Sequence, residues 1–111
     1  MSEKPLRWVG SSLDDLRGFT PEARRRAGYQ LRRLQAGLMP DDWRPMTTVG
    51  SGGQEIRIHT QTEQRVIYVA TLPEAIYVLH AFEKRTRRTR SKDIAIARRR
   101  LAAVRAGRGR S

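Results

Sequence analysis

Residues 55–82 read EIRIHTQTEQRVIYVATLPEAIYVLHAF, and this stretch decides the fold because it holds three strand patterns in close succession. Each pattern is rich in aliphatic, β-branched or aromatic residues, as strands that border a core are. The three runs are 55–59, 65–71 and 75–82. The two connections are five and three residues long, too short for a crossover helix. The stretch therefore predicts an antiparallel meander.

The chain before the meander predicts one short strand and two helices. Leu6–Val9 is the strand candidate, with Trp8 on the side opposite its neighbours. A first helix is expected from Ser11 or Ser12 to Gly18, because two aspartates fall in its first turn, where the helix dipole favours anions. A second helix should begin at Thr20-Pro21 and run to about Gly37. Its apolar positions have helical spacing: Ala23, Ala27, Leu31 and Leu34.

Two loops and a last helix complete the chain. Residues 39–53 are expected to form a loop because they are rich in proline, aspartate and glycine. Residues 84–90 should form a basic loop, followed by a helix over 91–107. The narrow apolar stripe of that helix suits a protein core: Ile94, Ala97, Leu101 and Val104.

These elements predict an α+β fold with the order strand, helix, helix, three strands, helix. The first strand can pair beside the meander in a small, mainly antiparallel sheet, with the helices packed on one face and the other face open. We expect a single domain over residues 1–107 and a flexible basic end over 108–111.

The positive charge is concentrated in the last quarter of the chain. Residues 84–110 carry twelve Lys or Arg side chains and a single acid, Asp93, so they account for most of the net charge of +12. Such a segment favours a polyanionic partner, and nucleic acid is the first candidate. The narrow apolar stripe argues against a membrane anchor. The chain lacks cysteine, and its first ten residues lack the apolar core of a signal peptide, so a cytoplasmic protein is expected.

The residue types present limit the chemistry. The two histidines, His59 and His80, do not have the spacing of metal ligands, and the glycines at 50–53 precede a strand instead of linking a strand to a helix. We therefore expect no metal and no cofactor, and phosphate chemistry performed with fixed cations. The sequence candidates are Arg57, Arg65, Lys84 and Arg85 for the phosphate, and Arg87, Arg88, Arg90 and Lys92 for further RNA contacts.

Proton transfer has two candidates, and each has a structural alternative. His80 has a suitable unperturbed pKa, but Ile76, Val78, His80 and Phe82 should share one face of their strand, which favours a buried, hydrogen-bonded histidine. Tyr68 alternates with apolar residues, so it could contact RNA or pack in the core.

Three segments together resemble the phage-derived, HigB-like (Gp49-like) branch of the RelE/ParE toxin superfamily. They are GGQEIRI at 52–58, RVIYVA at 65–70 and AIYVLHAFEKRTRRT at 75–89, followed by a helix with DIAIARRR. The last segment is the most specific, because members of the branch end this strand with a histidine, a phenylalanine, two cations and two threonines. The upstream strand and helical hairpin also agree with the order of elements in the family.

The resemblance implies a toxin of a type II toxin–antitoxin system. Such a toxin cuts messenger RNA on the ribosome by metal-free attack of the 2′-hydroxyl, and a helix-turn-helix (HigA-like) antitoxin neutralises it. Arg57, Arg65 and the Lys84-Arg85 pair correspond to cations that grip the scissile phosphate in such toxins. Two departures stand out: Arg90 replaces the usual proline, and the C-terminal tyrosine or histidine of some relatives is missing after His80.

Two other functions remain open at the level of sequence. A gyrase-poisoning toxin of the same superfamily is one, although members of that branch usually lack the catalytic cations. A nucleic-acid-binding protein without catalysis is the other, and basic composition alone favours it. Against it, aromatic residues make up only 6% of the chain, so a stacking platform for bases is not evident.

Overall fold

A five-stranded sheet with helices on both faces forms the domain, which the computed structural model describes over residues 3–108. Along the chain the elements are β1 (Leu6–Trp8), α1 (Ser12–Arg17), α2 (Pro21–Gln35), β2 (Trp43–Pro45), β3 (Gly53–His59), β4 (Glu63–Val69), β5 (Ile76–Lys84) and α3 (Ser91–Arg108). The strand order in the sheet is β1-β5-β4-β3-β2. β1 pairs parallel to β5, and every other pair is antiparallel. The α+β class and the mainly antiparallel sheet are as predicted from the sequence.

The meander of β3, β4 and β5 is confirmed, and its partner β2 is the strand that the sequence did not predict. β2 lies inside the expected loop 39–53, where its three residues pair with Gln54, Glu55 and Ile56 of β3. A strand of three residues that ends in proline has too little alternation to be recognised from sequence. It lies at the edge of the sheet, where a proline is tolerated.

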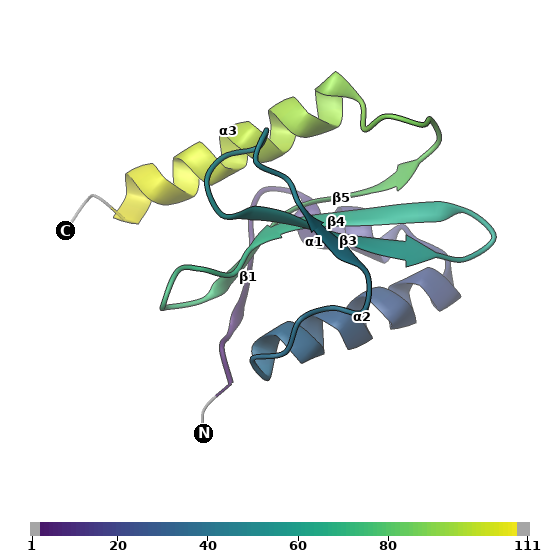
Figure 1. The fold of residues 1–111 in the computed structure, drawn as a ribbon, viewed down its shortest axis with the longest axis horizontal. Coiled ribbons are helices and arrows are strands. Elements are labelled where there is room, and N and C mark those ends of the chain that lie inside the picture. Colours follow the sequence, from purple (N-terminus) through teal and green to yellow (C-terminus); the bar gives the residue numbers. More distant parts are fainter. Residues whose placement is uncertain (1–2, 109–111) are drawn as a thin grey trace.

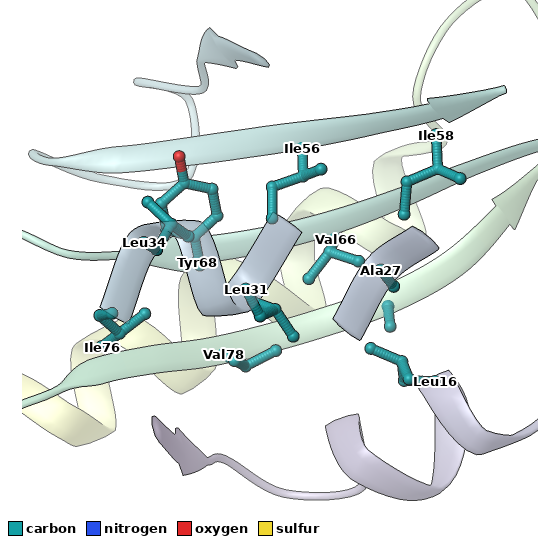
Figure 2. Packing of buried hydrophobic residues seen from close by; sticks show 11 residues of the cluster. Leu16, Ala27, Leu31, Leu34, Ile56, Ile58, Val66, Tyr68, Ile76 and Val78 are labelled. Carbon is teal, nitrogen blue, oxygen red and sulfur yellow. The ribbon is translucent and has the colours of Figure 1, made fainter. Parts of the chain in front are cut away.

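α1 and α2 cover one face of the sheet, as predicted. Thr20 caps α2 by accepting a hydrogen bond from the Ala23 amide, and Pro21 occupies the first helical position. Figure 2 shows how the buried side chains of α2 meet those of the strands. The predicted apolar positions of α2 are all buried: Ala23, Ala27, Leu31 and Leu34.

α3 packs against the opposite face of the sheet, so the prediction that all helices lie on one face and leave the other open was wrong. In Figure 1, α3 and α2 lie on opposite sides of the strands. A second hydrophobic cluster joins Ala97 and Leu101 of α3 to Leu79 and to Ile67 and Val69 of β4. The apolar stripe of α3 was predicted correctly. The overlooked signal is the unbroken apolar run 66–69 of β4, which makes both faces of this strand apolar, so that each face needs a cover.

The turn before β3 lets α3 approach closely. Gly50 has a φ of 144°, and a Cβ atom there would lie 2.8 Å from Cδ2 of Leu101. Glycine at this position therefore serves both the backbone conformation and the packing of the helix.

The C-terminal boundary differs slightly from the predicted one. Helix α3 continues through Arg108, whose Nε lies 2.7 Å from Oε2 of Glu74. The rest of the expected flexible end, 109–111, lies outside the described residues.

Candidate functional site

The strands bring a group of charged side chains together on the α3 side of the sheet. Ile56 and Ile58 belong to the core under α2, so the alternating residues of β3 point to the opposite side. Across the sheet, Arg44 pairs with Glu55, Arg57 with Arg65, and Glu63 with Lys84. We call five of these residues the cationic cluster: Arg44, Glu55, Arg57, Arg65 and Lys84.

Glu55 is the buried anion of this cluster. It is only 3% exposed, and Oε1 lies 3.8 Å from Nε of Arg65. Burial raises the pKa of its carboxyl group, although the charges of Arg65, Arg44 and the other cations act to lower it. Desolvation and the neighbouring positive charges therefore act in opposite directions on the pKa of Glu55, and desolvation has the larger effect.

The structure buries Arg65, which the sequence placed on an exposed face. Arg65 is 2% exposed, and its Nη1 donates to Oε1 of Glu63 at 3.2 Å and to the Gln64 carbonyl at 2.9 Å. The guanidinium is thus held within the protein. Its charge acts on the site from below the surface, and Arg65 lines the larger of the two grooves described next.

Two grooves border the end of β5. One has a volume of about 380 Å³ and is lined by residues of β4, β5 and the following loop: Glu63, Arg65, Lys84, Arg85, Thr86 and Arg87. The other, of about 170 Å³, is bordered by the same loop and by Asp93 of α3. Lys84, Arg85 and Thr86 line both grooves.

Lys84 is the cation of this cluster whose pKa is clearly changed by its surroundings. It is partly buried, and desolvation lowers the pKa of its ammonium group, with Arg65, Arg57 and Arg44 acting in the same direction. A lysine whose pKa is lowered gives up its proton more readily than an ordinary lysine, and the neutral amine can accept one. Lys84 therefore combines a positive charge with a lowered pKa in one side chain that lines both grooves.

The other predicted cations of the loop are at the surface. The Arg85 side chain is 73% exposed and pairs with Glu83 at 3.4 Å. Arg87 lines the larger groove, and Arg88, Arg90 and Lys92 line the smaller one. Thr86 donates to the Arg88 carbonyl at 2.6 Å, so it forms the turn that the sequence suggested for it. These side chains are placed where a polyanion could contact them.

His80 is a buried, hydrogen-bonded histidine. It is 6% exposed, Nε2 lies 2.7 Å from Oδ1 of Asp93, and Nδ1 lies 3.9 Å from Oδ2 of Asp15. The ring stacks on Phe82 with centroids 5.1 Å apart. This arrangement fits the buried, hydrogen-bonded histidine that was the alternative to a catalytic role, since the residue is almost fully buried and Nε2 is hydrogen-bonded to Asp93.

The prediction that Ile76, Val78, His80 and Phe82 share one face of β5 was wrong, because the pairing of β5 with β4 is irregular. Register shifts between Ile67 and Tyr68 of β4, so the side of the sheet that each β5 residue faces changes along the strand. Ile76 and Val78 consequently face α2, whereas His80 pairs with Ile67 on the α3 side.

Tyr68 lies in the core and not at an RNA-facing surface. It is fully buried among the residues of Figure 2, and burial raises its pKa. Among the described residues its hydroxyl has no hydrogen-bond partner. We therefore do not keep Tyr68 among the candidates for contact with substrate.

Several arginines of α3 form hydrogen bonds within the protein. Arg98 donates to the Thr48 carbonyl, Arg100 to the Leu79 carbonyl at 2.8 Å, and Arg105 to the Ser51 carbonyl. With the Arg108–Glu74 pair, these contacts fasten the helix to the sheet and to the turn before β3. The density of charge in the tail therefore overstates the charge that is available to a polyanion.

A second histidine lies at the tip of the β3–β4 hairpin. His59 Nε2 lies 2.6 Å from Oδ2 of Asp42, and Nδ1 lies 2.8 Å from Oε1 of Glu63. These hydrogen bonds, first that to Asp42, raise the pKa of His59. Because Glu63 also contacts Arg65, the hairpin tip is linked to the cationic cluster.

Sequence reasoning missed Arg44, Glu55 and Asp93 as parts of the site. The alternation that placed Arg57 on the outer face also placed Glu55 there, so that signal was present. Arg44 was hidden in the unrecognised strand β2, and Asp93 was noted only as the single acid of the basic segment 84–110.

The molecule is thus an α+β domain that gathers cations around one buried carboxylate on the meander. A family model matches residues 14–102, and the matched family is described as Gp49-like phage-derived protein (DUF891). The match covers most of the chain, so this protein belongs to that family, which is compatible with a toxin of a toxin–antitoxin system. No curated protein matches the sequence significantly. Within residues 3–108, no helix is both long and apolar enough to cross a membrane.

Proposed function

We propose that the protein is the toxin of a type II toxin–antitoxin system and that it cleaves messenger RNA on the ribosome without a metal ion. The observation that supports this most is Lys84, a partly buried lysine of lowered pKa at the junction of two cation-lined grooves. Membership of the Gp49-like family agrees with a toxin.

In the proposed reaction, the 2′-hydroxyl of RNA attacks the adjacent phosphodiester. Lys84, in its neutral form, takes the proton of the 2′-hydroxyl. The nucleophilic oxygen bonds to phosphorus, the bond to the 5′-oxygen breaks, and that oxygen takes up a proton from water, while the Lys84 ammonium group returns its proton to the solvent. The products are a 2′,3′-cyclic phosphate and a 5′-hydroxyl. Arg85 stabilises the negative charge that grows on the phosphoryl oxygens, and Arg65 adds its charge from beneath the groove. Arg57, the cross-strand partner of Arg65, adds its charge from the neighbouring strand.

The proposed partners are the ribosome with its messenger RNA and a helix-turn-helix antitoxin. The loop cations Arg87, Arg88 and Arg90, together with Lys92 at the start of α3, would bind RNA backbone phosphates, which is a salt-sensitive interaction. The antitoxin would cover the same surface with acidic or apolar segments. The reaction takes place in the cytoplasm, where ribosomes translate.

Growth inhibition tests the toxin proposal directly. Expression of the wild type alone should arrest growth, and co-expression of a helix-turn-helix protein encoded beside it should restore growth and co-purify with it. Lys84→Met should lose toxicity, whereas Arg32→Met, which removes one exposed cation from α2 on the other side of the sheet, should keep it. Growth arrest with intact messages would instead support the gyrase-poisoning alternative.

A binding protein without catalysis is the second candidate, and one observation favours it. Arg65 and His80, which the sequence offered for the chemistry, are both buried and bonded within the protein. If the wild type binds RNA and ribosomes but leaves messages intact and growth normal, this candidate replaces the toxin.

A further inference from the structure

Three polar atoms of the cationic cluster are buried without a hydrogen bond. They are Oε2 of Glu55, Nε of Arg57 and Nε of Arg65, and within residues 3–108 each is without a partner. Buried polar groups in proteins are nearly always hydrogen-bonded, so three exceptions in one cluster require an explanation. Catalytic hydrogen bonds are often long in the free protein and shorten only when substrate binds.

The three atoms come from neighbouring positions on one side of the sheet. Arg57 and Arg65 are cross-strand partners, and Glu55 lies two residues before Arg57 on β3. Oε1 of Glu55 is 3.8 Å from Nε of Arg65, which is close enough for an ion pair and too long for a hydrogen bond. Glu63 holds the other end of the same guanidinium through Nη1.

Glu55 is enclosed too deeply to contact RNA itself. The residue is 3% exposed, and Oε2 is buried. Any effect of Glu55 on RNA must therefore pass through the cations around it. Those cations repel one another, and the negative charge of Glu55 is the buried charge that offsets this repulsion.

We propose that Glu55 is a positioning residue, whose carboxylate holds the guanidinium groups of Arg57 and Arg65 in the geometry that receives the scissile RNA phosphate. The inference relies on the proposed nuclease function for its reaction, whereas the positioning of the two arginines can be measured without it. Stability alone does not explain the residue, because a buried ion pair can usually be replaced by neutral groups of similar volume without loss.

The substitution Glu55→Gln tests the proposal because it keeps the shape of the side chain and removes its charge. In single-turnover assays at saturating ribosome concentration, message cleavage should fall on the order of 10- to 100-fold, since small misplacements of catalytic groups have effects of this size. Binding to programmed ribosomes should stay equal or become tighter, because a negative charge has been removed from the cationic cluster. Glu55→Asp, which keeps the charge, should recover part of the rate.

Glu22→Gln is the matched control. Glu22 lies on α2 and forms an exposed ion pair with Arg26, so its substitution changes the net charge by the same amount at a distance from the site. Cleavage and binding should match the wild type. Equal cleavage rates for Glu55→Gln and Glu22→Gln would overturn the positioning role.

The pH dependence of the wild type provides a second readout. Burial raises the pKa of Glu55, and the carboxylate acts only when deprotonated, so its contribution is present above that pKa and is lost as the pH falls through it. The decline in cleavage at acidic pH should be steeper in the wild type than in Glu55→Gln. The charged groups that face Glu55 are Arg44, Arg57, Arg65 and Lys84, and their positive charges act to lower its pKa. His80 lies further along the same side of the sheet.

Nuclear magnetic resonance separates a failure of positioning from a failure of the nuclease proposal. In the wild type, the Nε–H signals of Arg57 and Arg65 should be resolved and exchange slowly, and inorganic phosphate should shift them. Both effects should disappear in Glu55→Gln. If the wild type does not cut RNA but shows these signals, the nuclease proposal fails and the positioning stands. If the signals are the same in both proteins, the positioning fails.

Discussion

At the scale of single residues, Lys84 differs from the arginines around it because its charge can change. Arginine stays protonated at any pH at which the protein is folded, whereas a desolvated lysine among cations can become neutral. The cationic cluster therefore contains one side chain suited to moving a proton and several suited to holding a phosphate. This division of roles leads to a test with two substitutions at one position.

Lys84→Arg should separate charge from proton transfer. Arginine keeps the positive charge, so binding to programmed ribosomes should change little, but cleavage should fall by about 100-fold or more, the usual size of a general acid–base contribution. Lys84→Met should lose cleavage and also bind more weakly. Single-turnover cleavage and filter binding measure the two effects. A Lys84→Arg protein with an unchanged cleavage rate would show that Lys84 acts only through its charge.

His59 should make the stability of the protein depend on pH. Its raised pKa means that its contribution is complete below the unfolded value of 6.5 and is lost as the pH rises through the folded value. The lowered pKa of Glu63 sets the other limit, because that contribution is lost as the pH falls through its folded value, below 4.5. The effect should be at most about 1 kcal/mol, since the partners are partly exposed. Unfolding by urea at several pH values should show this dependence in the wild type and not in His59→Gln.

At the scale of elements, α3 is fastened to the sheet by few apolar side chains and several arginines. Only Ala97 and Leu101 are buried along its 18 residues, while Arg98, Arg100 and Arg105 donate to backbone carbonyls elsewhere in the chain. The helix shapes the smaller groove through Asp93, so its docking also affects the site.

Leu101→Ala should therefore destabilise the protein markedly. Leu101 is 2% exposed and packs in the second hydrophobic cluster, so removal of its side chain leaves a cavity and should cost about 2–4 kcal/mol. Denaturant unfolding at neutral pH measures this loss. Ala102→Gly, at an exposed position of the same helix, should lower stability by only about 1 kcal/mol. A loss in Leu101→Ala no larger than this would mean that α3 contributes little to the folded state.

The elements also show how far sequence reasoning reaches. The periodicities of β3, β4, β5, α2 and α3 were readable because long alternating or helical patterns are strong signals. β2 was missed because three residues ending in proline give no pattern. The face of His80 was misjudged because an irregularity in strand pairing depends on the partner strand. The burial of Arg65 was missed because it depends on contacts with Glu63 and the Gln64 carbonyl.

At the scale of the whole molecule, the basic residues behind the net charge of +12 fall into two groups, those that line the grooves and those that bond within the protein. The loop after β5 presents arginines that line the grooves, whereas several arginines of α3 bond to the protein's own carbonyls. A count of basic residues does not distinguish these groups.

The salt dependence of RNA binding should make the distinction. The double variant Arg87→Met/Arg88→Met should lower the slope of log affinity against log salt by about 1.4, because each phosphate contact to a single strand contributes about 0.7. The double variant Arg98→Met/Arg105→Met removes the same charge and should leave the slope nearly unchanged. Equal reductions in both variants would mean that the whole tail contacts RNA.

The measurement that decides the proposed function is the mapping of message ends after translation in a purified system with wild type or Lys84→Met. We predict cuts at fixed positions within codons, with 2′,3′-cyclic phosphate and 5′-hydroxyl ends, which require both translating ribosomes and Lys84. Intact messages with the wild type, or the same cuts with Lys84→Met, would contradict the proposed reaction.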